Sequence, residues 1–155
     1  MKKYISTTLI QGEKVILSPH VHSIVYIRPF IGFFIISLLG LVAALTAPWE
    51  VVALWEAGGL VICGIWHIYD RLFYNNMELA VTNKRVVAKT GIISVQSEEL
   101  QWNKIESIEI RQGILGRMLK YGDVYFSGTG TSFVRFGDVR NPWNVKAKAA
   151  EILSN

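Results

Sequence analysis

The sequence has one cysteine and a long stretch without basic residues, and both shortages limit what the protein can be. Cys63 is the single cysteine among 155 residues, so an intrachain disulfide is excluded, and neither a CxxC motif nor a Cys/His metal spacing occurs. No lysine or arginine lies between residues 29 and 70. Because hydrophobic residues make up 51% of the chain, this stretch indicates a membrane anchor attached to a small domain.

Two apolar runs fill the stretch without basic residues. "PFIGFFIISLLGLVAALTA" (29–47) has no charge, and "VVALWEAGGLVICGIWHIY" (51–69) has one acid, Glu56. At about 1.5 Å per helical residue, each run spans roughly the ~30 Å hydrocarbon core of a bilayer. The sequence therefore predicts a transmembrane helical hairpin over 29–72. Because the first run begins only after mixed polar sequence, we expect retained membrane segments rather than a cleaved signal peptide.

The charges beside the two runs predict how the hairpin is oriented. Arg28 precedes the first run, Arg71 follows the second, and the connecting loop offers only Glu50. Since basic flanks tend to remain cytoplasmic, both termini are expected on the cytoplasmic side of a bacterial inner membrane. The chain then divides into a cytoplasmic N-terminal segment (1–28), the hairpin (29–72) and a cytoplasmic domain (76–155).

Small residues and one acid are the candidates for packing between the two membrane helices. Gly40 with Ala44, and Ala53 with Ala57, have the four-residue spacing that lets helices approach closely. Glu56 is costly in lipid and such acids usually mark a function or a partner. It lies about two turns into its run, so the alternatives are an interfacial polar group, which we expect, or a contact with a partner.

Beyond residue 77 the hydrophobic period changes from helical to alternating. Half-buried strands are predicted over six segments: 78–82, 85–89, 92–100, 105–110, 122–128 and 132–139. A helix is predicted over 141–153, with Asn141 as N-cap and Pro142 at its first position. Antiparallel strands capped by a C-terminal α-helix fit a pleckstrin-homology (PH)-like barrel or sandwich, with an open sheet or another small barrel as alternatives. Residues 13–19 either supply a seventh strand or lead into the membrane.

Several stretches carry a resemblance to a known family. The two apolar runs followed by "ELAVTNKRVVAKTGII" (78–93), "IESIEIRQGILGRMLKYGDVYFSGTGT" (105–131) and "VRNPWNVKAK" (139–148) resemble the YdbS-like bacterial PH domain membrane proteins. The similarity extends from about residue 10 to the end. It implies a membrane-anchored PH-like domain, in a class defined by architecture rather than by a shared reaction, and it supplies no catalytic residues.

The usual signatures of chemistry are not found in the sequence. "GTGTS" (128–132) lacks the pattern of a phosphate-binding loop and suits a hairpin turn. "HVH" (20–22) has no third ligand at a zinc spacing, and Cys63 lies in an apolar run without a neighbouring base. We therefore expect no enzyme, no metal and no cofactor. Basic residues do not alternate with a surface of aromatic residues, so nucleic acid is not an expected partner.

Anionic lipid headgroups are the ligand that the basic residues suit best. The candidate contacts are Arg28, Arg71, Lys84, Arg85, Arg117 and Lys120. The alternative is an ordinary solvated surface. "GILGRMLKYG" (113–122) combines apolar and basic residues; we expect it to pack into the core, with insertion into the membrane or a partner as the alternative.

The resulting hypothesis is a binding or scaffold module at the cytoplasmic face of a bacterial inner membrane, which recruits or organises partners. Its partners would be membrane lipids and other membrane proteins or further copies of itself. The alternative is a structural subunit of a membrane complex or homo-oligomer with no lipid ligand.

Overall fold

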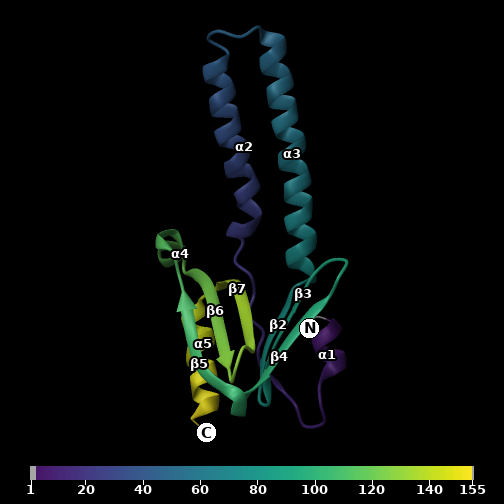
Figure 1. The fold of residues 1–155 in the computed structure, drawn as a ribbon, viewed down its shortest axis with the longest axis vertical. Coiled ribbons are helices and arrows are strands. Elements are labelled where there is room, and N and C mark those ends of the chain that lie inside the picture. The colour runs from purple at the N-terminus through teal and green to yellow at the C-terminus, as the bar shows by residue number, and fades with distance from the viewer. Residues whose placement is uncertain (1–2, 155) are drawn as a thin grey trace. The chain divides into compact units, whose positions relative to one another are not determined.

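A computed structural model describes residues 3–154, and the chain folds into two compact units. The helical unit is Ser23–Asn75; the domain unit combines the chain up to His22 with the chain from Asn76 onward. Figure 1 shows the elements of each unit. The N-terminal segment, which the sequence analysis sets apart as 1–28, thus contributes most of its length to the domain.

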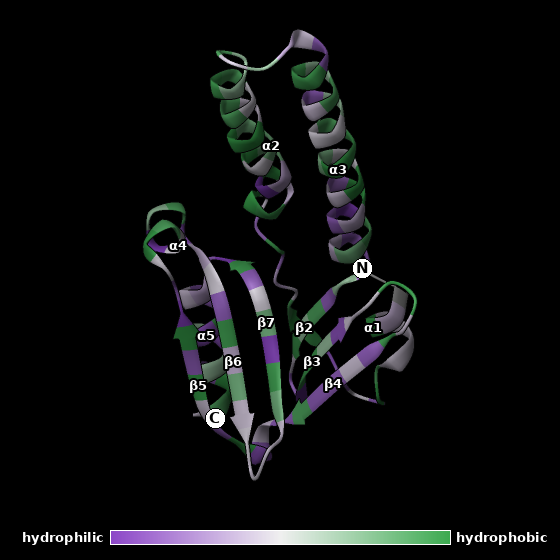
Figure 2. Cartoon of the chain, turned by 45° about the horizontal axis from the view of Figure 1, so that its top comes forward, coloured by the Kyte–Doolittle hydropathy of each residue, from purple (hydrophilic) through white to green (hydrophobic). Residues whose placement is uncertain are grey.

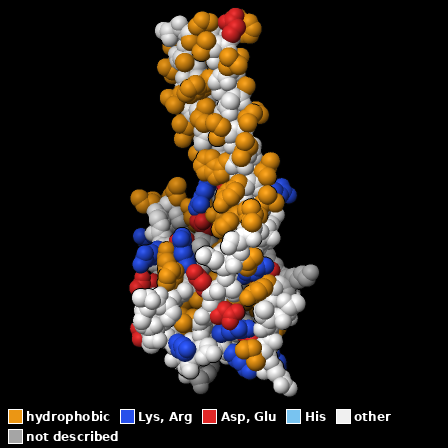
Figure 3. All heavy atoms as spheres, turned by 45° about the vertical axis from the view of Figure 1, so that its right-hand side comes forward, with side chains coloured by type: hydrophobic (Ala, Val, Ile, Leu, Met, Phe, Trp, Pro, Cys, Tyr) orange, Lys and Arg blue, Asp and Glu red, His pale blue; other side chains and the backbone are white. Residues whose placement is uncertain are grey.

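The helical unit contains α2 (Ile24–Ala43) and α3 (Trp49–Asn76). Both helices are long and apolar enough to cross a membrane, which suggests membrane association. Hydrophobic residues predominate along both helices (Figure 2). On the face drawn in Figure 3, most lysine, arginine and acidic side chains belong to the domain unit. The two predicted runs largely coincide with these helices. However, α2 begins five residues before residue 29 and ends four residues before residue 47, and α3 continues seven residues past residue 69.

The first sheet contains β1 (Val15–Leu17), β2 (Glu78–Thr82), β3 (Arg85–Thr90) and β4 (Gln96–Gln101), in that order and antiparallel. Residues 13–19 therefore supply the seventh strand through β1. The predicted strand 92–100 is too long at its start, because the chain bends over residues 92–94 and pairs with β3 only from Gln96. Helix α1 (Lys3–Thr8) is attached to this sheet: the Glu78 carboxylate accepts the N–H groups of Tyr4 and Ile5 at 3.2 and 3.1 Å.

The second sheet contains β5 (Ile105–Arg111), β6 (Tyr121–Gly128) and β7 (Phe133–Arg140), in that order and antiparallel. The 3-10 turn η1 (Trp102–Lys104) links the two sheets, and the short helix α4 (Ile114–Leu119) connects β5 to β6. The "GTGTS" segment forms the turn between β6 and β7, as predicted, closed by a bond from the Gly128 N–H to the Ser132 carbonyl at 2.9 Å. Alternate residues of β6 are buried, which confirms the period-two pattern.

The core of the domain is formed by the inner faces of the two sheets and by α5 (Pro142–Leu153). Phe126 and Phe136 are fully buried with ring centroids 5.1 Å apart, and α5 contributes buried Val145 and Ala149. Asn141 precedes the helix as predicted, but its side chain makes no capping hydrogen bond and its φ is 52°. Two sheets and a C-terminal helix are compatible with a PH-like fold; across residues 3–154 the strands belong to two separate sheets.

Candidate functional site

The six basic residues predicted to contact headgroups lie in three places. Arg28 and Arg71 are on α2 and α3, Lys84 and Arg85 are in the turn between β2 and β3, and Arg117 and Lys120 are on and directly after α4. The two pairs in the domain have very different surroundings, which decide what each can bind.

Arg85 points into the domain and is held by an ion pair with Glu13. Its Nε and Nη2 atoms donate to the two carboxylate oxygens of Glu13 at 3.0 and 3.1 Å. Nη2 also donates to the Thr8 carbonyl at 2.6 Å, and Nη1 pairs with Glu99 of β4. The Glu13 side chain is fully buried and that of Arg85 is 12% exposed. The guanidinium is therefore occupied by the protein itself.

The titration of Glu13 and Arg85 is shifted in the direction that keeps both charged. Burial raises the pKa of Glu13, but hydrogen bonds from the Ile10 N–H, Arg85 and Thr82 outweigh it, so the pKa lies below its ordinary value. Burial lowers the pKa of Arg85, but bonding to Glu13 and the charge of Glu99 outweigh it and raise that pKa. A buried pair of this kind strongly resists loss of either partner, because the remaining charge would be buried alone.

The rest of the 82–85 turn (Thr82–Arg85) holds the same N-terminal loop. The Asn83 side chain accepts the Lys14 N–H at 2.8 Å and donates to the Gly12 carbonyl at 3.1 Å. Lys84 is exposed, but its Nζ donates to the Gln11 carbonyl at 2.8 Å. The turn thus serves as a clamp that fixes residues 8–14 to the sheet.

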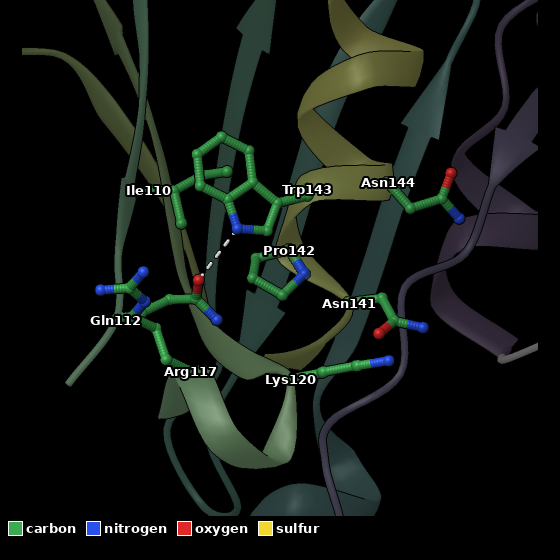
Figure 4. Close-up of a pocket in the computed structure, with 8 residues that line it drawn as sticks. All are labelled: Ile110, Gln112, Arg117, Lys120, Asn141, Pro142, Trp143 and Asn144. Atoms are coloured by element: carbon green, nitrogen blue, oxygen red, sulfur yellow. Dashed lines mark hydrogen bonds between the residues drawn. The ribbon is translucent and has the colours of Figure 1, made fainter. Parts of the chain in front are cut away.

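The second pair of basic residues faces an open pocket of about 810 Å³. The pocket is lined by Ile110, Gln112, Arg117 and Lys120 from the β5–α4–β6 connection and by residues 141–144 at the start of α5 (Figure 4). None of the described residues that line it is acidic. Within the described chain, neither Arg117 nor Lys120 has a side-chain hydrogen bond or an ion pair. Both cations are free to bind an anion.

Gln112 fixes the position of α4 through its side-chain amide. Its Nε2 donates to the carbonyls of Tyr121 and Gly116 at 2.8 and 3.3 Å, and its Oε1 accepts the Trp143 indole N–H at 3.0 Å (Figure 4). The carbonyl of Lys120 accepts the N–H of Asn141 at 2.8 Å. The loop, the sheet and α5 are thereby joined by polar bonds around the pocket.

The expectation that residues 113–122 pack into the core is wrong for the apolar side chains of α4. Ile114, Leu115 and Met118 are 83%, 64% and 73% exposed, and Leu119 is also exposed. Gly116 is the buried residue of this helix, and a Cβ there would lie 2.7 Å from the Tyr121 carbonyl oxygen. The backbone of α4 approaches β6 so closely at Gly116 that its larger side chains are directed outward.

Comparison with known proteins identifies the family of this chain. A family model described as "Bacterial PH domain" matches residues 30–155, which is most of the chain. The chain belongs to this family. No curated protein and no solved structure matches it. Proteins with PH domains generally bind lipids or proteins, so membership suggests a binding or scaffold module.

The match to the bacterial PH domain family begins at residue 30, after β1 and after Glu13. In this PH domain, however, β1 pairs with β2 and Glu13 lies in the buried ion pair. The N-terminal segment is thus an integral part of the domain.

Within the helical unit, the contact between α2 and α3 uses some of the predicted residues. Gly40 is buried beside Trp55 and Glu56, and the Glu56 carboxylate accepts a hydrogen bond from Ser37 Oγ at 2.6 Å. Glu56 is therefore bonded to the neighbouring helix. By contrast, the three predicted alanines are exposed; they are Ala44, Ala53 and Ala57.

Sequence reasoning missed other residues at both sites. Gly59 is buried against Ile36 and Phe33 and takes the place expected of the alanines on α3. At the pocket, Gln112 and Trp143 were not identified, because a single glutamine or tryptophan carries no motif. The one available signal was the apolar character of residues 114–119, which is unusual for a connection between strands.

Proposed function

We propose that this protein is a membrane-anchored binding or scaffold module of the YdbS-like type, with its PH domain at the cytoplasmic face of a bacterial inner membrane, where it recruits or organises partners. The observation that carries the proposal is how few residues, within 3–154, separate the domain's elements from the two apolar helices along the chain. His22 is followed by α2 from Ile24, and α3 ends at Asn76, two residues before β2. A domain joined this closely to two apolar helices stays at the membrane surface.

The distribution of charge supports the proposed orientation. Arg28 and Arg71 are near the domain ends of α2 and α3, whereas the connection at the opposite ends of these helices has no basic residue. The positive-inside rule therefore favours cytoplasmic termini. In the cytoplasmic leaflet, anionic headgroups are available to Arg117 and Lys120, whose side chains are free, rather than to Arg85, which pairs with Glu13.

We further propose that the module is not an enzyme. The lining of the open pocket combines two cations with amide and indole groups, and it includes no carboxylate, histidine, cysteine or serine. These groups bind an anion but supply neither a nucleophile nor a general base. Recognition is the role that this set of side chains supports.

The second candidate function is a structural subunit of a membrane complex or homo-oligomer without a lipid ligand. The edge strands β4 and β5 offer unpaired backbone groups that could pair with another chain. Of the four edge strands within residues 3–154, β4 carries Glu98 and Glu99 and β5 carries Glu106 and Glu109; these acids oppose the pairing of β4 or β5 between copies. This feature favours the binding module over the homo-oligomer.

The test is crosslinking of the full chain in its native membranes, followed by mild detergent extraction and mass spectrometry, with membranes lacking the chain as the control. A defined set of other membrane proteins is the expected result. Recovery of the chain as a discrete homo-oligomer would support the structural alternative. Release of the chain from membranes by alkaline carbonate would contradict the anchored module itself.

A further inference from the structure

Helix α4 and Trp143 form an exposed apolar surface that the domain does not use for its own packing. We call this the α4 face and define it as Ile114, Leu115, Met118 and Trp143. Trp143 is 64% exposed, comparable to the three residues of α4. Four large apolar side chains gathered at one end of a small domain indicate a surface that contacts something apolar.

Polar hydrogen bonds, rather than packing of the apolar side chains, hold the α4 face in position. The Gln112 amide bonds to Gly116, Tyr121 and Trp143, and Gly116 packs against the β6 backbone. The Trp143 indole is held by its N–H and directed to the pocket edge (Figure 4). Because these bonds use only the Gln112 amide, backbone carbonyls and the indole N–H, they position the apolar groups without covering them.

Basic residues lie beside the apolar ones on the same short segment. Arg117 lies between Leu115 and Met118 in the sequence of α4, and Lys120 follows the helix directly. No acid lines the adjoining pocket. Apolar side chains together with free lysine and arginine are the composition of segments that lie in the interfacial layer of an anionic membrane. A protein partner would need no such cations unless it were itself acidic.

The path of the chain shows why a bilayer is within reach of this surface. His22 is the last residue of the N-terminal part of the domain unit, and its ring stacks on Tyr121, the residue after Lys120, with centroids 5.3 Å apart. The His20 carbonyl accepts the Arg140 N–H at 3.0 Å beside it. The apolar run begins at Pro29, only about 10 Å further along a helix. The chain thus leaves the domain for the first apolar helix directly beside α4.

We propose that the α4 face inserts into the interfacial layer of the cytoplasmic leaflet and that Arg117 and Lys120 bind lipid phosphates beside it. This inference rests on the proposed membrane anchoring and adds the surface by which the domain docks. Docking at α4 directs the opposite end of the β6–β7 hairpin away from the bilayer. Phe133 is at that end: it pairs with Ser127, whereas Arg140 pairs with Tyr121 next to α4.

The test uses the full chain with a single reactive cysteine in vesicles of phosphatidylethanolamine and phosphatidylglycerol. Cys63→Ser removes the native thiol and keeps a donor for the Pro29 carbonyl. Met118→Cys then carries an environment-sensitive fluorophore on the α4 face. Phe133→Cys carries it at an exposed position at the far end of β7, about 23 Å along the strand from Arg140. Quenching by nitroxide lipids and by a water-soluble quencher is compared for the two labels.

We expect nitroxide lipids to quench the label at residue 118 at least fivefold more strongly than the label at residue 133. The double change Arg117→Glu and Lys120→Glu should reduce the quenching at residue 118. If both labels are quenched equally by the water-soluble quencher, while the chain still resists extraction by alkaline carbonate, docking by α4 is overturned but membrane anchoring is not. A label at residue 118 shielded from both quenchers would overturn insertion in favour of a protein contact. Loss of the chain from the vesicles would instead contradict the anchoring.

Discussion

The 82–85 turn and α4 each place an Arg and a Lys on a short connection between strands, yet their side chains have opposite roles. In the 82–85 turn, Arg85 is paired with buried Glu13 and Lys84 is bonded to Gln11. On α4, Arg117 and Lys120 face a pocket without acids. The difference comes from the N-terminal segment: its described residues supply a carboxylate and carbonyls to the 82–85 turn, but no acid to Arg117 or Lys120.

This comparison shows that basic residues in a sequence do not by themselves define a binding surface. Glu13 and Arg85 are 72 residues apart in the chain, and the whole helical hairpin lies between them. A headgroup contact at Arg85 would first require breaking a buried ion pair, whereas a contact at Arg117 requires only the displacement of water. The following predictions test this contrast.

The largest effect is expected from Glu13→Ala. The change leaves the Arg85 guanidinium with a buried positive charge and one remaining acid, and it should reduce the free energy of unfolding of the domain by about 3–5 kcal/mol. The measurement is native-state proteolysis of the full chain in detergent. Glu106→Ala, at an exposed acid of β5, is the matched control and should have little effect. Equal protease resistance of the two variants would show that the ion pair contributes little.

Acid should weaken the same ion pair gradually. The pKa of Glu13 is lowered in the folded protein, so its contribution is complete above the pKa of an unfolded glutamate, about 4.3, and is lost as the pH falls through the lower folded value. Arg85 contributes no dependence in this range because its raised pKa is far above it. Unfolding measured against pH should show a steeper acid loss in the native chain than in Glu13→Gln. If the stability of both proteins falls equally with decreasing pH, Glu13 is not the group responsible for the acid loss.

The double change Arg117→Ala and Lys120→Ala should leave folding intact and weaken membrane docking. Each cation near an anionic leaflet contributes about 1 kcal/mol, so losing both should shift the docked equilibrium by about 2 kcal/mol, roughly 30-fold. The measurement is the phosphatidylglycerol content needed for half-maximal lipid quenching of a label at Met118. Lys104→Ala, at an exposed lysine before β5, is the control. The same midpoint in both variants would argue against a headgroup site.

Gln112→Ala should loosen α4 by about 1–2 kcal/mol, because the change removes the bonds to the Gly116 and Tyr121 carbonyls and to the Trp143 indole. Hydrogen exchange of the α4 amides should become faster, while the amides of β6 change little. Gln101→Ala, at an exposed glutamine of β4, provides the comparison. If α4 exchange is unaffected, the helix is held by other contacts.

The smallest effect is expected from Lys84→Ala. The lysine is exposed and its single bond to the Gln11 carbonyl is open to water, so its loss should cost about 0.5 kcal/mol or less. Proteolysis of the full chain and lipid quenching at residue 118 should both stay near the values of the unchanged protein. A loss of docking comparable to that of the α4 variant would place Lys84 at the lipid surface and remove the contrast between the two regions.

The local pattern of the chain was sufficient to predict most elements. Alternating residues predicted the strands of both sheets, and the Asn141-Pro142 pair predicted the start of α5. The strand 92–100 was predicted too long because Ile92, Ile93 and Val95 have a high strand propensity, although no neighbouring strand pairs with them. The capping hydrogen bond predicted for the Asn141 side chain is not formed: Asn141 has a left-handed backbone, and its N–H bonds to the Lys120 carbonyl.

The candidate site was less accessible from sequence. Arg117 and Lys120 were identified by charge alone, together with residues that have other roles. The exposure of the α4 side chains was not predicted, because apolar residues between strands usually enter the core. Only the close approach of Gly116 to β6 directs them outward. The packing of α2 on α3 likewise depends on rotation of the helices, which places Gly40 and Gly59 in the contact and exposes the predicted alanines.

By itself, the sequence determined the two long apolar helices, the alternating strands and the C-terminal helix, because hydrophobic period and run length are local properties of the chain. The tertiary structure decided that the N-terminal segment completes the first sheet, that Arg85 is neutralised by Glu13 and that Arg117 and Lys120 remain free beside an exposed apolar helix. These outcomes depend on which distant groups meet when the chain folds. Arg85 is a structural group because it is buried beside an opposite charge, whereas Arg117 and Lys120 remain available because no acid lines their pocket among the described residues.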